Sequence, residues 1–301
     1  MTASEALFLV IGATGAQGGA TARQLLDRGH RVRVLVRDPV KAKHFADWGA
    51  EVYQGDLSVP SSVEDAVKGV TAVFSVPILD MTDPESEYRN AVTLIQAAHR
   101  AGVRHFVQTS VAGTGDHKTM TRAGTGYWND YYWESKWLIE EAVRNAGFET
   151  YTIFKPTLYM ENFLPPMADF MYPDLRNGEI LSAINPQTRL HMIAVGDIGA
   201  FAVSAFENPQ TFAGKTIELA AEALTVDEIA AVLSDVKGHT IKTTTLSPEE
   251  ARLRGRSLYR EDEWLNEVGH HTPIGELAEY GLRLTTFREW AEKNAGYIIV
   301  R

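Results

Sequence analysis

"LFLVIGATGAQGGATARQLL" covers residues 7–26 and decides the fold class of this 301-residue chain. The apolar run at 7–11 is typical of a buried β-strand, and the residues after Gly18 follow helical spacing. Gly12, Gly15 and Gly18 occupy the turn between the two elements. Because glycine has no Cβ, the backbone can bend sharply there and let a phosphate group approach the amino end of the helix. The stretch therefore predicts a nucleotide-binding strand–turn–helix unit.

Five more apolar runs follow in the first half of the chain, separated by segments with helical spacing. The six predicted strands are LFLVIG (7–12), RVRVLVR (31–37), AEVYQGDL (50–57), TAVFSVP (71–77), RHFVQTS (104–110) and ETYTIFKP (149–156). Most helical segments end on a glycine, a common helix terminator: Gly29, Gly49, Gly69, Gly102 and Gly147. Strands that alternate with helices form right-handed crossovers and a parallel sheet. We therefore predict an α/β fold with a doubly wound parallel sheet.

The pattern changes after Pro156. We expect helices at 195–209, 224–238, 247–255 and 285–294 and strands at 215–220 and 239–246, with Thr225 and Ser247 as helix caps. These elements predict a smaller α+β lobe over residues 158–301. The nucleotide-binding domain is predicted over 1–157, with its core completed by segments around 190–220. The glycine-rich segment 112–130 is either a mobile lid or a disordered loop.

Composition disfavours several classes of function. The 29 basic and 39 acidic residues leave a net charge of −10, which repels nucleic acid, and the absence of cysteine excludes disulfides and thiolate chemistry. No apolar run reaches the roughly 20 residues that span a bilayer, and the first residues lack a basic leader. The adjacent pair His270–His271 is a poor chelator, so we expect no metal site. We predict a cytoplasmic protein that binds neither nucleic acid nor membranes.

The end of the second predicted strand indicates which dinucleotide binds. Folds that prefer NAD usually carry an acidic residue there, about 20 residues after the glycine turn. Here Arg37 stands 19 residues after Gly18 (37 − 18), and Lys41 follows it. A guanidinium group makes charge-assisted hydrogen bonds to a 2′-phosphate, so the sequence predicts NADP(H). Asp38 remains an alternative that could bind a ribose hydroxyl, and Asp56 and Leu57 are expected to flank the adenine.

These features together resemble the NmrA-like proteins, a branch of the atypical short-chain dehydrogenases/reductases. The resemblance runs over nearly the whole chain. It rests on GATGAQGG (12–19), VLVRDPVKA (34–42), GDL (55–57), VFSVP (73–77), FVQTS (106–110), KPTLYMENF (155–163), IAVGDIGAFA (193–202) and LTTFREWAEKN (284–294). The family contains NADPH sensors and transcriptional co-regulators as well as quinone, isoflavone and ether reductases. The resemblance therefore implies a fold and a cofactor but leaves the activity open.

The resemblance implies a Rossmann domain and a set of residues that bind NADP(H). The phosphate turn and adenosine end are expected to use Gly12, Thr14, Gly15, Ala16, Gln17, Gly18, Arg37, Lys41, Asp56 and Leu57. The nicotinamide end is expected to be framed by Ser75, Val76, Pro77, Thr109, Ser110, Lys136, Pro156, Thr157 and Tyr159.

Tyr132 and Lys136 are the candidate catalytic pair. They have the Tyr-x-x-x-Lys spacing of short-chain dehydrogenases, which puts both on one helix face. Hydride transfer to a carbonyl needs a proton donor, and a nearby ammonium group is expected to lower the pKa of the phenol. Alternatively, Tyr132 only packs within the aromatic-rich segment. Ser110 is the candidate third member, although the alignment can instead place Val111 at the catalytic serine position.

Three functions follow from these observations. The first is an NADPH-dependent reductase of an apolar carbonyl, quinone or related aromatic compound. The second is a non-catalytic NADP(H) sensor that acts through a protein partner, and the third is an isomerase or biosynthetic enzyme with a structural dinucleotide. An apolar set after Pro156 either forms core or partly lines a substrate pocket: Met160, Phe163, Met167, Phe170, Met171 and Tyr172. The pattern leaves the oligomeric state open.

Overall fold

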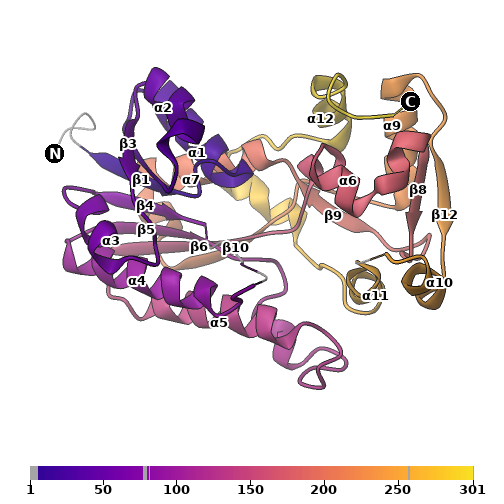
Figure 1. Cartoon of the computed structure of the whole chain (residues 1–301), viewed down its shortest axis with the longest axis horizontal. Coiled ribbons are helices and arrows are strands. Elements are labelled where there is room, and N and C mark those ends of the chain that lie inside the picture. The colour runs from indigo at the N-terminus through magenta and orange to yellow at the C-terminus, as the bar shows by residue number, and fades with distance from the viewer. Residues whose placement is uncertain (1–5, 77–79, 81, 257, 301) are drawn as a thin grey trace. The chain divides into compact units, whose positions relative to one another are not determined.

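The computed structural model describes residues 6–76, 80, 82–256 and 258–300. The chain forms two compact units (Figure 1). The first contains the residues up to Gly115 together with Asn129–Lys155 and Val195–Glu218. The second contains Asp116–Trp128, Pro156–Ala194 and the residues from Leu219 onwards.

A seven-stranded sheet forms the centre of the first unit, in the order β10-β6-β5-β4-β1-β2-β3. The strands are β1 (Leu7–Ile11), β2 (Arg31–Val36), β3 (Glu51–Gln54), β4 (Ala72–Ser75), β5 (His105–Thr109), β6 (Thr150–Pro156) and β10 (Lys215–Leu219). Strands β1 to β5 pair in parallel with their neighbours, and β5 pairs in parallel with β6. Every residue of β1 and β4 is buried. Parallel strands covered on both faces need such continuous apolar runs, and this confirms the predicted α/β fold.

Helices cover both faces of this sheet. Figure 1 shows α3, α4 and α5 along one face and α1 and α7 on the other, and α1 packs against α7 as α4 packs against α5. The helices of the unit are α1 (Ala16–Asp27), α2 (Lys43–Asp47), α3 (Pro60–Ala66), α4 (Ser86–Arg100), α5 (Asp130–Arg144), α7 (Val195–Glu207) and α8 (Pro209–Phe212), with a 3-10 turn η1 (Pro39–Ala42). The five glycines predicted to end helices all have a positive φ.

The seventh strand lies within 190–220, the region that the sequence predicted to complete the core of the nucleotide-binding domain. There β10 pairs with β6, and α7 and β10 both belong to the first unit. Backbone hydrogen bonds support this pairing, because the amide of Gly214 donates to the carbonyl of Tyr151 at 2.8 Å. The pairing covers the edge of β6, which would otherwise expose unpaired backbone groups.

The second unit contains two small sheets, β11-β9-β7 and β12-β8. Its strands are β7 (Leu158–Tyr159), β8 (Glu179–Ser182), β9 (Leu190–Ile193), β11 (Glu222–Leu224) and β12 (Lys242–Thr245). Its helices are α6 (Met167–Met171), α9 (Val226–Lys237), α10 (Pro248–Leu253), α11 (Tyr259–Glu267) and α12 (Phe287–Lys293). Four 3-10 turns complete it: η2 (Asp116–Lys118), η3 (Met160–Phe163), η4 (Pro173–Asn177) and η5 (Ile274–Tyr280). Thr225 and Ser247 cap α9 and α10 through capping boxes, as predicted.

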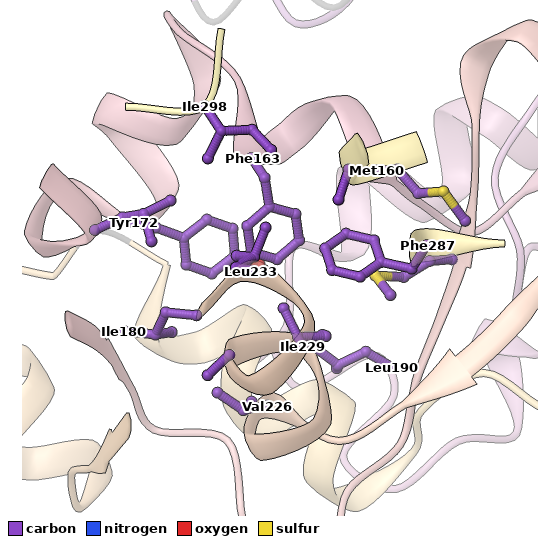
Figure 2. Close-up of a cluster of buried hydrophobic side chains, with 14 of the residues drawn as sticks. Met160, Phe163, Tyr172, Ile180, Leu190, Val226, Ile229, Leu233, Phe287 and Ile298 are labelled. Carbon is purple, nitrogen blue, oxygen red and sulfur yellow. The ribbon is translucent and has the colours of Figure 1, made fainter. Parts of the chain in front are cut away.

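Aromatic and aliphatic side chains from α9, α12 and the 160–172 segment form the core of this unit (Figure 2). The ring of Phe163 stacks on that of Tyr172 at 4.6 Å between centroids, and Phe287 meets Phe163 edge-on at 5.3 Å. Met160 also belongs to this core, whereas Met167 and Phe170 are 42% and 54% exposed. The predicted apolar set is thus partly core, and its regular helix is limited to the five residues of α6.

The segment 116–128 is ordered by contacts within the second unit. Trp128 is buried, and its indole N–H donates to the carbonyl of Thr121 at 2.7 Å. The hydroxyl of Tyr127 donates to the carboxylate of Glu263 on α11 at 2.9 Å. These contacts attach the segment to α11 and contradict the expectation of a disordered loop.

Candidate functional site

The turn after β1 is built from close backbone contacts that only glycine permits. A Cβ on Gly18 would lie 2.4 Å from the carbonyl oxygen of Gly12, and Gly12 itself has a φ of +70°. The amide of Gly15 donates to the carbonyl of Gly12 at 2.9 Å, and α1 begins one residue later. The strand and the helix therefore approach each other closely, and the N–H groups at the amino end of α1 favour an anion.

A cavity of about 370 Å³ lies beside this turn. Its walls come from the turn itself, from the ends of β2, β3 and β4, and from the first half of α4. The lining residues are Ile11, Gly12, Thr14, Leu35, Val36, Arg37, Gly55, Asp56, Leu57, Ser75, Val76, Asp80, Ser86, Glu87, Asn90, Ala91 and Leu94. We refer to it as the switch-point pocket, because β1 has β2 on one side and β4 on the other. Ligands of doubly wound sheets bind at this reversal of strand order.

Several residues that the sequence predicted to bind the cofactor lie in this wall. Of the predicted cofactor residues, seven line the pocket: Gly12, Thr14, Arg37, Asp56, Leu57, Ser75 and Val76. Gly15, Ala16, Gln17 and Gly18 form the turn and the start of α1. Lys41 lies exposed in η1 and is not among the lining residues, and Asp38 caps that turn by accepting from the amide of Val40 at 3.0 Å. Pro77 lies outside the described residues.

The end of the pocket near β2 and β3 is charged. It shares residues with a second cavity of about 430 Å³, whose lining includes Arg37 and Arg89. Arg89 pairs with Asp83 at 2.5 Å. The carboxylate of Asp56 accepts from the amide of Ser58, and this hydrogen bond, with a smaller effect of Arg37, lowers the pKa of Asp56. Two guanidinium groups suit a phosphate, although the carboxylates in the same wall offset part of their charge.

The predicted catalytic pair lies on α5. Lys136 Nζ lies 5.5 Å from the ring centroid of Tyr132, which confirms that both residues share one helix face. Lys136 is buried, and its ammonium group donates to Glu87 Oε1 at 2.6 Å. Burial, and then the charge of Glu87, raise the pKa of Tyr132 above its ordinary value. The expectation that a neighbouring ammonium gives Tyr132 a lowered pKa is therefore wrong, because burial raises this pKa and the negative charge of Glu87 acts in the same direction.

Ser110 belongs to a different group of side chains. Its hydroxyl donates to Glu140 Oε1 at 2.6 Å. The same buried carboxylate accepts from Arg144 at 2.7 Å and pairs with Lys155 at 3.3 Å. Thr109, the other predicted residue at this strand end, donates to the carbonyl of Ser75 at 3.4 Å. The structure thus brings Tyr132 and Lys136 together and places Ser110 in the Glu140 network.

The remaining predicted site residues lie after the end of β6. Pro156, Thr157 and Tyr159 belong to the second unit, where the hydroxyl of Thr157 donates to the carbonyl of Leu219 at 3.0 Å. That unit has its own hollow of about 440 Å³, partly lined by Phe170, Met171 and Tyr172.

Three polar residues of the switch-point pocket were not predicted from the sequence. Ser86, Glu87 and Asn90 line it from the first turns of α4, within a segment that was expected only to form a helix. One signal was present, since a helix that follows the strand at the switch point starts beside the ligand crevice.

Within residues 6–76, 80, 82–256 and 258–300, no helix is both long and apolar enough to cross a bilayer. In the same part of the chain, no group of three or more acidic or histidine side chains is arranged to hold a metal ion. His270 is partly buried, and the loss of hydration around its ring lowers its pKa to about 4; the ring centroid lies 6.5 Å from that of His191.

Known proteins include relatives that align with most of this chain and with most of their own length. The chain is 26% identical to the NmrA-like family domain-containing oxidoreductase malD of Malbranchea aurantiaca, over 97% of this chain and 98% of that protein. It is 30% identical to a (4-alkanoyl-5-oxo-2,5-dihydrofuran-3-yl)methyl phosphate reductase of Streptomyces griseus, over 84% of this chain and 82% of the relative.

The chain shares its fold with solved structures. The triphenylmethane reductase of Citrobacter sp., complexed with NADP(H), superposes with a TM-score of 0.79 at 21% identity, over 96% of this chain and 100% of that one. The cofactor in that complex is the one predicted here from Arg37. The sequence model of the NmrA-like family matches residues 4–290, and the chain therefore belongs to the NmrA-like family.

Proposed function

We propose that the switch-point pocket binds NADP(H) and that the protein is an NADPH-dependent reductase of an apolar carbonyl or quinone-like substrate. The observation that carries this proposal is the glycine turn at the amino end of α1, which opens onto a pocket with Arg37 at its other end. The reductase relatives and the NADP(H) complex of the Citrobacter enzyme support the same cofactor.

Each part of the pocket suits one part of the dinucleotide. The turn at Gly12–Gly18 offers backbone N–H groups to the diphosphate. Arg37 supplies charge for the 2′-phosphate, and Leu35 and Leu57 supply an apolar wall for the adenine. The nicotinamide half would bind on the β4 side of the pocket, which is lined by Ser75 and Val76.

When bound, NADPH supplies a hydride to the substrate. The chain's own contribution is a proton donor for substrates that develop an alkoxide or a phenolate. We propose Tyr132 for this role, as a phenol that burial and Glu87 keep neutral. The hydrogen bond to Glu87 fixes the position of the Lys136 ammonium, one helical turn from Tyr132.

A second function is favoured by one observation. Ser110 donates to Glu140, so its hydroxyl is engaged outside the Tyr132–Lys136 pair. A pocket that binds dinucleotide without a complete reductase set would suit an NADP(H)-responsive regulator that acts through a protein partner. Such a regulator needs a different affinity for its two cofactor states.

Turnover experiments separate the two functions. Loss of NADPH absorbance would be followed with quinones, aromatic ketones and aromatic aldehydes. Turnover with any of them supports the reductase. Saturable binding of NADPH with no turnover on the whole panel supports the regulator, and no binding of NADPH contradicts both.

A further inference from the structure

The hollow of about 440 Å³ in the second unit has no ligand in the function proposed so far. Every residue that lines it belongs to the second unit, whereas the switch-point pocket is formed by the first unit alone. We refer to it as the second-unit pocket. Its volume lies within the range of about 300–1,000 Å³ that is typical of small-molecule sites. The pocket therefore has room for a ligand of its own.

Apolar and aromatic side chains form more than half of the wall of this pocket. Phe170 and Met171 come from α6, Leu181 comes from β8, Ile184 follows β8, and Leu265 comes from α11. Leu181 and Ile184 are buried, whereas Phe170 is 54% exposed, so a ligand can reach its ring from solvent. Such a wall suits an aromatic molecule, because aromatic rings pack well against apolar and aromatic side chains.

A buried phenol lies in the same wall without a hydrogen-bond partner. Tyr172 is 8% exposed and lines the pocket, and its ring stacks on that of Phe163. Its hydroxyl forms no hydrogen bond with any residue in the part of the chain that the structure describes. Because a buried polar group without a partner is costly, this hydroxyl gains from a ligand that completes its hydrogen bonding.

Two carboxylates from the first turn of α11 also line the pocket, those of Glu261 and Asp262. Asp262 lies near Tyr172, since its charge contributes to the raised pKa of that phenol. Asp262 Oδ2 accepts from the amide of Ala183 at 2.8 Å, and the described residues supply no other donor to this carboxylate. Asp262 is only partly buried, so its second oxygen is available to a ligand.

The arginines of the pocket do not neutralise these two acids. Arg256 pairs with Asp174 at 2.9 Å and donates to two backbone carbonyls. It forms no ion pair with Asp262 or Glu261. With the exposed Arg254, two guanidinium groups line the pocket against three carboxylates. The polar end of the pocket therefore favours a cation over a neutral or anionic group.

We propose that the second-unit pocket binds an arylalkylamine, a small molecule with an aromatic body and a protonated primary amine. An ammonium group has three N–H donors and a positive charge. One donor meets the second oxygen of Asp262 and another meets the hydroxyl oxygen of Tyr172, while the aromatic body lies against Phe170. The ammonium also compensates the charge of Asp262, which a neutral ligand cannot do. This site is independent of NADP(H) binding.

The test compares amines with alcohols of the same shape. Calorimetric titration near pH 8, at which Asp262 and the amines are both charged, would use 2-phenylethylamine, 4-phenylbutylamine and tryptamine. Each is paired with its alcohol: 2-phenylethanol, 4-phenylbutanol and tryptophol. At least one amine is expected to bind with one molecule per chain, about tenfold more tightly than its alcohol, since its hydrogen bond joins two charged groups.

Asp262→Asn should remove this preference for the amine. Its affinity for the amine is expected to fall about tenfold, whereas its affinity for the alcohol stays within about twofold. Asparagine can still accept from the amide of Ala183, so the variant is expected to fold. Asp235→Asn is the matched control, because Asp235 lies on α9, is 66% exposed and pairs with Arg288 outside the pocket. Its affinities should equal those of wild type.

A second pair of variants tests the apolar end. Phe170→Ala is expected to weaken the amine and its alcohol by the same factor of about fivefold or more, because both lose the same aromatic contact. Met167→Ala is its control, since Met167 lies on the same helix, is 42% exposed and does not line the pocket. Neither ligand should bind this variant differently from wild type.

Three results would overturn the proposal. The first is a wild-type protein that binds none of the three amines or binds each no more tightly than its alcohol. The second is a folded Asp262→Asn variant that keeps the preference for the amine. The third is an unchanged affinity in Phe170→Ala, which would place the ligand outside the second-unit pocket.

Discussion

A Cβ atom on Gly18 would lie 2.4 Å from the carbonyl oxygen of Gly12 and 2.7 Å from that of Ile11. Both contacts are far shorter than carbon and oxygen tolerate, and both involve backbone rather than a movable side chain. The start of α1 therefore lies against the end of β1 only because residue 18 has no side chain. This distance fixes where the first N–H groups of α1 point.

Gly18→Ala should consequently destabilise the protein and weaken NADPH binding together. Overpacking of a tight contact costs about 1–3 kcal/mol, and the shifted helix would no longer present its N–H groups to the diphosphate. Urea unfolding and calorimetry measure the two effects. Gly196→Ala is the control, because a Cβ at Gly196 on α7 meets no atom within 4 Å. A Gly18→Ala variant as stable as wild type would contradict the account of the turn.

Arg37→Ala should change the choice of cofactor. Loss of the guanidinium is expected to lower the affinity for NADPH by about tenfold or more, because a charge-assisted hydrogen bond to the 2′-phosphate disappears. NADH has no such phosphate, so its affinity should change little. Dissociation constants for both cofactors give the ratio, and an unchanged ratio would remove Arg37 from the 2′-phosphate site.

Tyr132→Phe should lower kcat while leaving NADPH affinity nearly unchanged. General acid catalysis typically contributes about 10²-fold or more, so a loss of that size is expected with substrates that need a proton. Because burial raises the pKa of Tyr132 above the ordinary value of 10.0, the phenol stays protonated through neutral and mildly alkaline pH. The kcat of the wild-type protein should then show no decline from this group below pH 10. Equal kcat values for variant and wild type would show that the hydroxyl donates no proton.

Asp262→Asn should stabilise the protein in a pH-dependent way. Burial raises the pKa of Asp262 from 3.8 to about 6, so between these values the folded state binds more protons than the unfolded state. Stability is therefore lost as the pH rises through this window, by at most about 3 kcal/mol. Asparagine carries no charge and can still accept from the amide of Ala183, which now donates to Asp262 at 2.8 Å.

The free energy of unfolding should thus rise by about 1–3 kcal/mol in Asp262→Asn near pH 8, and the gain should shrink as the pH falls towards about 4. The lowered pKa of His270 reduces the stability of the protein as the pH falls. This effect is the same in wild type and in Asp262→Asn, so it cancels when the two are compared. A gain of the same size at pH 5 and pH 8 would disagree with a titrating Asp262.

The sequence was most informative where structure is local. Six strands could be predicted because each is a short apolar run bounded by a glycine, and the glycine turn after β1 depends only on neighbours within the same segment. Contacts between segments that lie far apart in the chain could not be predicted from such local patterns. Glu87 looks like an ordinary charged residue of a helix, and only its bond to Lys136, 49 residues later, accounts for its burial.

The same limit applies to the second unit. The strand β7 has two residues, and it exists because Leu158 and Tyr159 pair with Met192 and Ile193. Strands this short have no recognisable period of their own, so their formation depends on the partner strand. The ionic network around Ser110 could not be predicted for the same reason, since Glu140, Arg144 and Lys155 come from later elements.

The central claim is that the pocket beside the glycine turn binds NADP(H). Isothermal titration calorimetry of the wild-type protein with NADPH and with NADH tests it most directly. The account predicts saturable heat for NADPH with one molecule bound per chain, and an affinity about tenfold above that for NADH. Absence of heat and of saturation with both cofactors would contradict it.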